Sequence, residues 1–134
     1  MKQIKKAIPA TNMNEVNARL IVAQHVDILH LTISNPALRN ALGPSIYETG
    51  IEIIRAAHHD SSVRAIILSG ADGQFCGGGN LHCLKKTREG PASIQFDGIS
   101  KFHSWIEAIR NCPKPVIAAV EGAGAHNGAS AIRI

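Results

Sequence analysis

The chain has 134 residues, a length that suits one domain with a hydrophobic core of its own. Hydrophobic residues make up 45% of it and charged residues 18%, which indicates a globular protein and excludes a disordered or low-complexity chain. The formal net charge is +4, but the lysines and arginines are scattered, so the sequence does not indicate a nucleic-acid partner.

The first part of the chain predicts an arm followed by a hairpin. Residues 1–17 are polar and mixed, and we expect them to form a flexible N-terminal arm. Arg19–Ala23 and Ile28–Ile33 read as two strands joined by residues 24–27. Asn35-Pro36 ends the second strand, because proline cannot donate to a strand ladder.

A helix is expected to begin at Gly43-Pro44, because proline at the first helical position loses no hydrogen bond. It ends at His58-His59-Asp60, where a cationic side chain interacts favourably with the helix dipole. Apolar or small residues recur at helical spacing and predict the core-facing stripe; they are Ile46, Gly50, Ile53, Ile54 and Ala57.

Two further strands are predicted, each followed by a glycine-rich loop. Ala65–Ser69 is an unbroken apolar run, the pattern of a strand covered on both faces, and the loop Phe75–Leu81 follows it. Val116–Val120 predicts another buried strand, which leads into the glycines after Glu121. A second helix lies between them, with Trp105 as a packing anchor and His103 at the surface; its apolar stripe is Ile99, Phe102, Ile106 and Ile109.

The alternation of strands and helices predicts parallel pairing and an α/β architecture. Glycine permits backbone conformations that other residues avoid, and it lets a ligand approach the main chain closely. Two neighbouring glycine turns could therefore direct two backbone N–H groups at one oxygen atom. That arrangement is the geometry of an oxyanion hole.

The cysteines and histidines do not indicate a metal or a disulfide. Cys76, Cys83 and Cys112 cannot all pair internally, and no signal peptide or bilayer-length apolar run is present. We therefore expect reduced thiols, a cytoplasmic location and no membrane partner. The spacing of Cys76, His82 and Cys83 matches no common zinc pattern, so no metal is expected, and Cys76 is read as a small residue buried beneath its loop.

Four segments together carry a resemblance to a known family; they are Asn35–Leu42, Arg64–Ser69, Phe75–Leu81 and Pro113–Gly122. Over residues 18–132 the sequence resembles the crotonase superfamily of enoyl-CoA hydratases and isomerases. It is most similar to the bacterial branch of enoyl-CoA hydratase or oxepin-CoA hydrolase of the alternative type. The resemblance implies a crotonase (ClpP-like) spiral of ββα units, with residues 18–134 as a partial domain truncated before the C-terminal helices. It also implies a homotrimer or hexamer for the full-length protein.

The resemblance also implies a site for an acyl-CoA substrate, with coenzyme A present only as part of the thioester and no separate cofactor. The oxyanion donors would be the backbone N–H groups of Gly79 and of Asn127, the latter within His126-Asn127-Gly128, where the family mostly has glycine. Lys85 and Lys86 have the charge to meet the phosphates. The substrate-binding positions would be Leu38, Arg39, Ala41, Gly77, Gly79, Asn80 and Leu81.

The sequence departs from the family at its acid–base residues, and this leaves alternatives open. Hydratases of the family use two glutamates, but the first aligns with Ser130 and the second would lie beyond Ile134. The chain is therefore either the N-terminal portion of an enoyl-CoA hydratase or isomerase, or a truncated and inactive remnant. A nucleotide-binding module is a third reading, although neither a dinucleotide fingerprint nor a Walker pattern is present.

Overall fold

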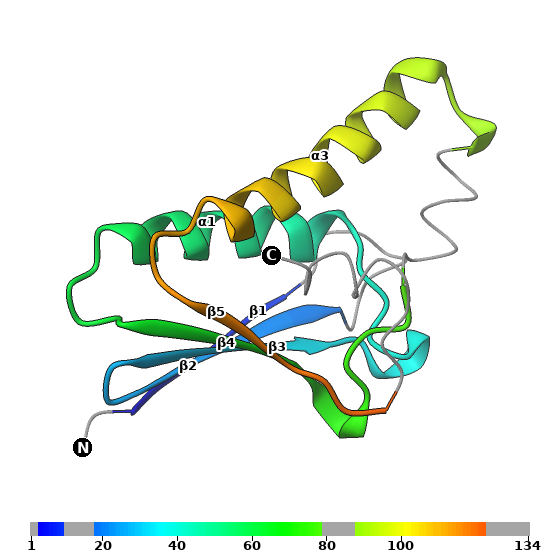
Figure 1. The fold of residues 1–134 in the computed structure, drawn as a ribbon. Coiled ribbons are helices and arrows are strands. Elements are labelled where there is room, and N and C mark those ends of the chain that lie inside the picture. The colour runs from blue at the N-terminus through cyan, green and yellow to red at the C-terminus, as the bar shows by residue number, and fades with distance from the viewer. Residues whose placement is uncertain (1–2, 10–17, 79–87, 123–134) are drawn as a thin grey trace.

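The computed structural model describes residues 3–9, 18–78 and 88–122, and in these ranges it forms one mixed sheet with two helices on one face (Figure 1). The sheet has five strands in the order β1-β2-β3-β4-β5. The pairs β1–β2 and β2–β3 are antiparallel, and β3–β4 and β4–β5 are parallel, which confirms the α/β prediction. The strands are β1 (Gln3–Pro9), β2 (Arg19–His25), β3 (Ile28–Ser34), β4 (Ala65–Gly70) and β5 (Val116–Ala119). The helices are α1 (Pro44–His58) and α3 (Ala92–Arg110). Two short 3₁₀ turns are η2 (Pro36–Leu38) and η3 (Ala71–Gly73).

The N-terminal segment differs from the prediction. Gln3–Pro9, within the expected flexible arm, forms β1 and pairs with β2 along its whole length, from Gln3 opposite His25 to Pro9 opposite Arg19. Without this strand, the outer edge of β2 would present a row of unpaired N–H and C=O groups. The mixed composition of residues 1–17 did not indicate that pairing.

The hairpin and the first helix confirm the sequence reading. β2 and β3 are joined by Val26 and Asp27, and α1 begins with Pro44 after the extended residue Gly43. Lys114, from the segment before β5, donates hydrogen bonds to the carbonyl oxygens of Ala57 and Asp60 at the end of α1. A cation at this position satisfies free carbonyls and complements the helix dipole.

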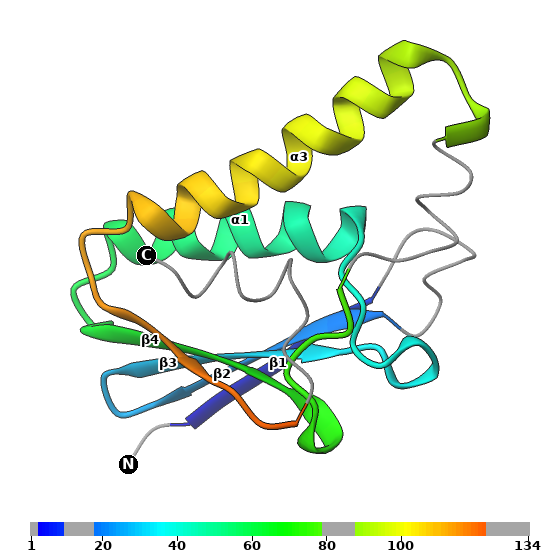
Figure 2. The ribbon, with the colours of Figure 1, turned by 45° about the vertical axis from the view of Figure 1, so that its right-hand side comes forward.

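The core lies between the sheet and α1, and α1 in turn lies between the sheet and α3 (Figures 1 and 2). β3 directs Leu29, Leu31 and Ile33 into this core, while the residues between them are half-buried. The expectation that the later strands are covered on both faces is wrong for the described residues: Ile67 is only half-buried, and Ile117 in β5 is 53% exposed. Both described helices cover the same face, and β5 is an edge strand.

Helices α1 and α3 meet at a glycine and a tryptophan. Trp105 is fully buried, which confirms it as a packing anchor, and its ring occupies the space where Gly50 lacks a side chain. Tyr47 and Phe102 add an edge-to-face contact with ring centroids 5.7 Å apart. Ile99, expected in the apolar stripe, is 57% exposed because the N-terminal half of α3 rises away from α1 (Figure 2).

Neither described helix combines the length and the hydropathy needed to cross a bilayer.

Candidate functional site

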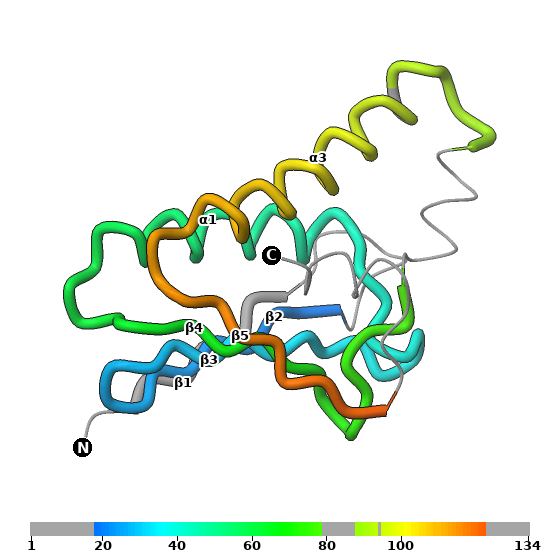
Figure 3. The backbone as a smooth tube through the Cα atoms, viewed as in Figure 1, coloured from blue at the N-terminus to red at the C-terminus, as the bar shows by residue number. Residues whose placement is uncertain are grey.

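The three parallel strands end at one edge of the sheet, and the segments that follow them come together there (Figure 3). These segments are residues 35–42 after β3, residues 71–78 after β4, and residues 120–122 after β5. Ligands of open α/β sheets bind beyond the carboxyl ends of the strands, where connections diverge. This edge is therefore the candidate site.

The first segment, residues 35–42, is a compact turn held by its own backbone. The Asn35 carbonyl accepts hydrogen bonds from the N–H groups of Leu38 and Asn40, at 3.0 and 2.9 Å. Arg39 and Asn40 both have left-handed backbones, with φ of 52° and 58°. Asparagine tolerates this conformation, whereas it is uncommon for arginine, so the Arg39 backbone is held by its surroundings.

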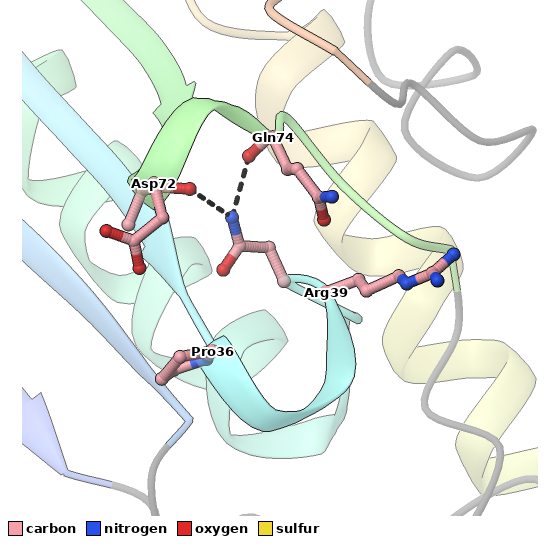
Figure 4. Close-up of a pocket in the computed structure, with 6 residues that line it drawn as sticks. Pro36, Arg39, Asp72 and Gln74 are labelled. Carbon is pink, nitrogen blue, oxygen red and sulfur yellow. Dashed lines mark hydrogen bonds between the residues drawn. The ribbon is translucent and has the colours of Figure 1, made fainter.

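The buried side chain of Asn40 joins this turn to the segment after β4 (Figure 4). Its Nδ2 donates to the carbonyl oxygens of Ala71 and Gln74, at 2.8 and 2.7 Å, and its Oδ1 accepts from the Asn35 N–H at 2.9 Å. A nearby hollow of about 200 Å³ has Arg39 and Asp72 on opposite sides. It is lined by Pro36, Arg39, Asn40, Ala71, Asp72 and Gln74.

Gly77 packs directly against the turn. A Cβ atom at Gly77 would lie 2.7 Å from the carbonyl oxygen of Arg39 and 3.3 Å from that of Leu38, so only glycine fits without a shift. The Leu42 N–H also donates to the Gly78 carbonyl at 2.7 Å. Of the predicted substrate-binding positions, the structure thus brings Leu38 and Arg39 against Gly77, and Ala41 lies in the same turn, where its N–H donates to the Leu38 carbonyl at 3.0 Å.

The segments that lead into the two glycine turns lie side by side. The Phe75 N–H donates to the Glu121 carbonyl at 2.8 Å. Gly122 has a φ of 59°, and a Cβ atom there would lie 2.5 Å from the carbonyl oxygen of Gly73. The predicted donors and tunnel residues themselves lie outside the described residues; they are Gly79, Asn80, Leu81 and Asn127, together with Lys85, Lys86, His126 and Ser130.

Cys76 is fully buried beneath the first glycine turn, which confirms its structural reading. Burial raises the pKa of its thiol, and its Sγ accepts a hydrogen bond from the Gly78 N–H at 3.3 Å. The Gly78 amide therefore points inward and is not a donor to a ligand. Within the described ranges, no three His, Cys, Asp or Glu side chains gather in a way that could hold a metal ion.

Sequence reasoning did not single out the buried amides of Asn35 and Asn40. Asn35 Nδ2 donates to the Ala41 carbonyl at 3.2 Å, so it braces the turn from inside, while Asn40 reaches out of it. The available signal was the residue type. Asparagine adopts left-handed geometry and bonds nearby backbone groups, so two asparagines around Pro36 mark an ordered turn.

Comparison with known proteins gives a consistent result. The family model described as enoyl-CoA hydratase/isomerase matches residues 24–131. A mitochondrial Delta(3,5)-Delta(2,4)-dienoyl-CoA isomerase of Mus musculus is 32% identical over 71% of this chain and 32% of its own length. An enoyl-CoA hydratase of Mycobacterium tuberculosis is 34% identical over 76% of this chain and 38% of its own.

The solved structures agree. The crystal structure of an enoyl-CoA hydratase from Polaromonas sp. JS666 superposes with a TM-score of 0.79 and 42% identity, over 83% of this chain and 45% of that one. Pseudomonas aeruginosa AtuE gives a TM-score of 0.78 at 31% identity, over 81% of this chain and 42% of that one. The chain thus spans less than half the length of each of these relatives.

Proposed function

Because this chain belongs to the enoyl-CoA hydratase/isomerase family, we propose that it binds an acyl-CoA thioester at the edge where β3, β4 and β5 end. The observation that carries the proposal is the junction of the two glycine turns, held by the hydrogen bond from the Phe75 N–H to the Glu121 carbonyl. In the sequence, the expected donor Gly79 follows Gly78 of the first turn, and the expected donor Asn127 lies five residues after Gly122 of the second. Two of the relatives are named a dienoyl-CoA isomerase and an enoyl-CoA hydratase, which supports the substrate class.

The proposed chemistry is stabilisation of negative charge on the thioester oxygen. When a proton leaves the carbon next to a thioester, the electron pair delocalises onto the carbonyl oxygen and gives an enolate. Two fixed backbone N–H groups at that oxygen need no reorganisation as charge develops, and loss of one such donor typically costs about 10²–10³ in rate. Leu38, Arg39, Ala41 and Gly77, with Asn80 and Leu81, are proposed to line the path of the coenzyme A portion.

The reaction class proposed is hydration or isomerisation of an enoyl-CoA. Position 130 carries a serine hydroxyl, which is a poor general base compared with a glutamate, so we assign no acid–base residue to this stretch of chain. Assembly as a trimer or hexamer and a cytoplasmic location are part of the same proposal.

Calorimetry on the folded chain tests this function. Acetoacetyl-CoA ionises to an enolate and should bind at least about tenfold more tightly than free coenzyme A, a difference of about 1.4 kcal/mol. Gly77→Ala should weaken binding of acetoacetyl-CoA, because the added methyl group lies against the Arg39 carbonyl. Absence of heat with acetoacetyl-CoA, from a sample shown to be folded by circular dichroism, would reject the proposal.

A further inference from the structure

We infer that Asn40 is a positioning residue of the proposed acyl-CoA site, acting through the segment that carries the first glycine turn. The inference rests on the proposed function and deepens it. Asn40 is 2% exposed, and both ends of its amide are used: the oxygen within its own turn, and the nitrogen on two carbonyls across the site. We place no contact between Asn40 and the substrate.

The two amide hydrogens of Asn40 bond to two points of one short segment. Ala71 and Gln74 lie at the start and just past the end of η3, and the Gln74 N–H also donates to the Ala71 carbonyl at 3.3 Å. One side chain thereby holds both ends of this turn, and Gly77 lies three residues further on. Among the described residues, the other hydrogen bond between the two segments is the backbone bond from Leu42 to Gly78.

Asn40 and Gly77 link the same two segments, residues 35–42 and residues 71–78, at different points along them. Gly77 sits against the Arg39 carbonyl with no room for a methyl group, so the distance between the segments is set tightly there. The Asn40 amide makes a second link between the segments, to the carbonyl oxygens of Ala71 and Gln74. Loss of the amide would let residues 71–78, which precede the proposed oxyanion donor Gly79 in the chain, move away from the turn.

The ionisation of bound acetoacetyl-CoA measures this effect. The ligand loses a C2 proton to the buffer, and the resulting enolate absorbs in the near ultraviolet, so its titration midpoint can be followed at saturating protein. An oxyanion site lowers this midpoint, because it binds the enolate better than the neutral thioester. In Asn40→Ala and in the milder Asn40→Ser, which keeps a hydroxyl for one backbone partner, we expect the midpoint to rise, by about one pH unit (tenfold) in the alanine variant.

A matched control separates positioning from stability. Lys114→Met removes the hydrogen bonds to Ala57 and Asp60 at the opposite end of the parallel strands, so it lowers stability without touching the site. Its thermal midpoint should fall while the ionisation midpoint of the bound ligand stays at the wild-type value. A structural role for Asn40 would give the same pattern as Lys114→Met.

The outcomes are distinct. A raised ionisation midpoint in Asn40→Ser, with the control unchanged, supports the inference, and Asn40→Ala should then show a larger rise. An unchanged midpoint in Asn40→Ser, which is the variant expected to stay folded, overturns it. If the wild-type chain binds no acetoacetyl-CoA, the proposed function fails, and that result is recognised before any variant is made.

Discussion

At the scale of single residues, the junction of the two glycine turns depends on Gly122. Its φ of 59° costs alanine and most other residues about 1–2 kcal/mol, and a side chain would also meet the Gly73 carbonyl. Gly73 has a similar φ of 73°, but a methyl group there would meet no atom within 4 Å. Comparing substitutions at Gly122 and Gly73 therefore distinguishes the effect of backbone strain from the effect of losing the contact between the turns.

Gly122→Ala should weaken binding of acetoacetyl-CoA by about tenfold or more, because the two turns must move apart, a cost of at least about 1.4 kcal/mol. Gly73→Ala should lose about 1 kcal/mol of stability from strain and change the affinity little. Calorimetry and urea denaturation measure the two quantities. Equal losses of affinity in the two variants would show that the contact between the turns has no role.

Cys76 offers a pH-dependent test of the buried loop. Burial raises the pKa of its thiol above the usual value of 9.0, so the folded state holds the proton where the unfolded state releases it. Stability gained from the neutral thiol is present below pH 9 and declines as the pH rises above it. Cys76→Ala should lack that part of the decline.

Alkylation by iodoacetamide at pH 8, followed by peptide mass mapping, should modify the half-buried Cys112 before Cys76, since the thiolate is the reacting form and Cys76 is both protonated and enclosed. In denaturant the two should react alike. Rapid modification of Cys76 in the folded protein would mean that the first glycine turn opens freely.

At the scale of secondary-structure elements, the contact between α1 and α3 reverses a general rule. Glycine inside a helix is normally less stable than alanine by about 0.5–1 kcal/mol. At Gly50 an added methyl group would lie 2.0 Å from the Trp105 ring, and overpacking of this kind costs about 1–3 kcal/mol. Gly50→Ala should therefore destabilise the protein, as judged by urea denaturation.

The exposed face of α1 supplies the comparison. Ala56 is exposed, so Ala56→Gly should lose about 0.5–1 kcal/mol, as helix propensity alone predicts. A gain of stability in Gly50→Ala would contradict the close packing of the two helices.

The elements also show how far the sequence could be read. β3, β4, α1 and the burial of Trp105 were predictable, because their hydrophobic periods and the proline at the first helical position act locally. The exposure of Ile99 and Ile117 was not, because it depends on the tilt of α3 and on which face of the sheet the helices cover. The hydrophobic periodicity of a segment does not predict which other elements pack against it.

The candidate site likewise has features that the sequence predicts and features that it does not. The glycine turns were predictable from the strand ends, and the family resemblance named Leu38, Arg39 and Gly77 as substrate-binding positions, which the structure finds in contact. The bridging amide of Asn40 did not, because its partners are main-chain carbonyls at Ala71 and Gln74, which leave no mark in the sequence. Gly79 and Asn127 as oxyanion donors stay predictions.

At the scale of the whole molecule, different kinds of segment gather at the amino and the carboxyl ends of the parallel strands. One end is fastened by contacts that serve the fold, such as the Arg64 N–H on the Asp27 carbonyl and Lys114 on the end of α1. The other end gathers the two glycine turns and the Asn35–Leu42 turn (Figure 3). This polarity predicts where a ligand should act.

Amide chemical-shift mapping of the ¹⁵N-labelled chain with acetoacetyl-CoA tests that polarity. Shifts should concentrate in residues 38–41, 75–78 and 121–122, while residues 26–27, 60–62 and 114 at the opposite end keep their positions. Shifts confined to the opposite end, or spread over the sheet without preference, would contradict an acyl-CoA site at the carboxyl ends of β3, β4 and β5.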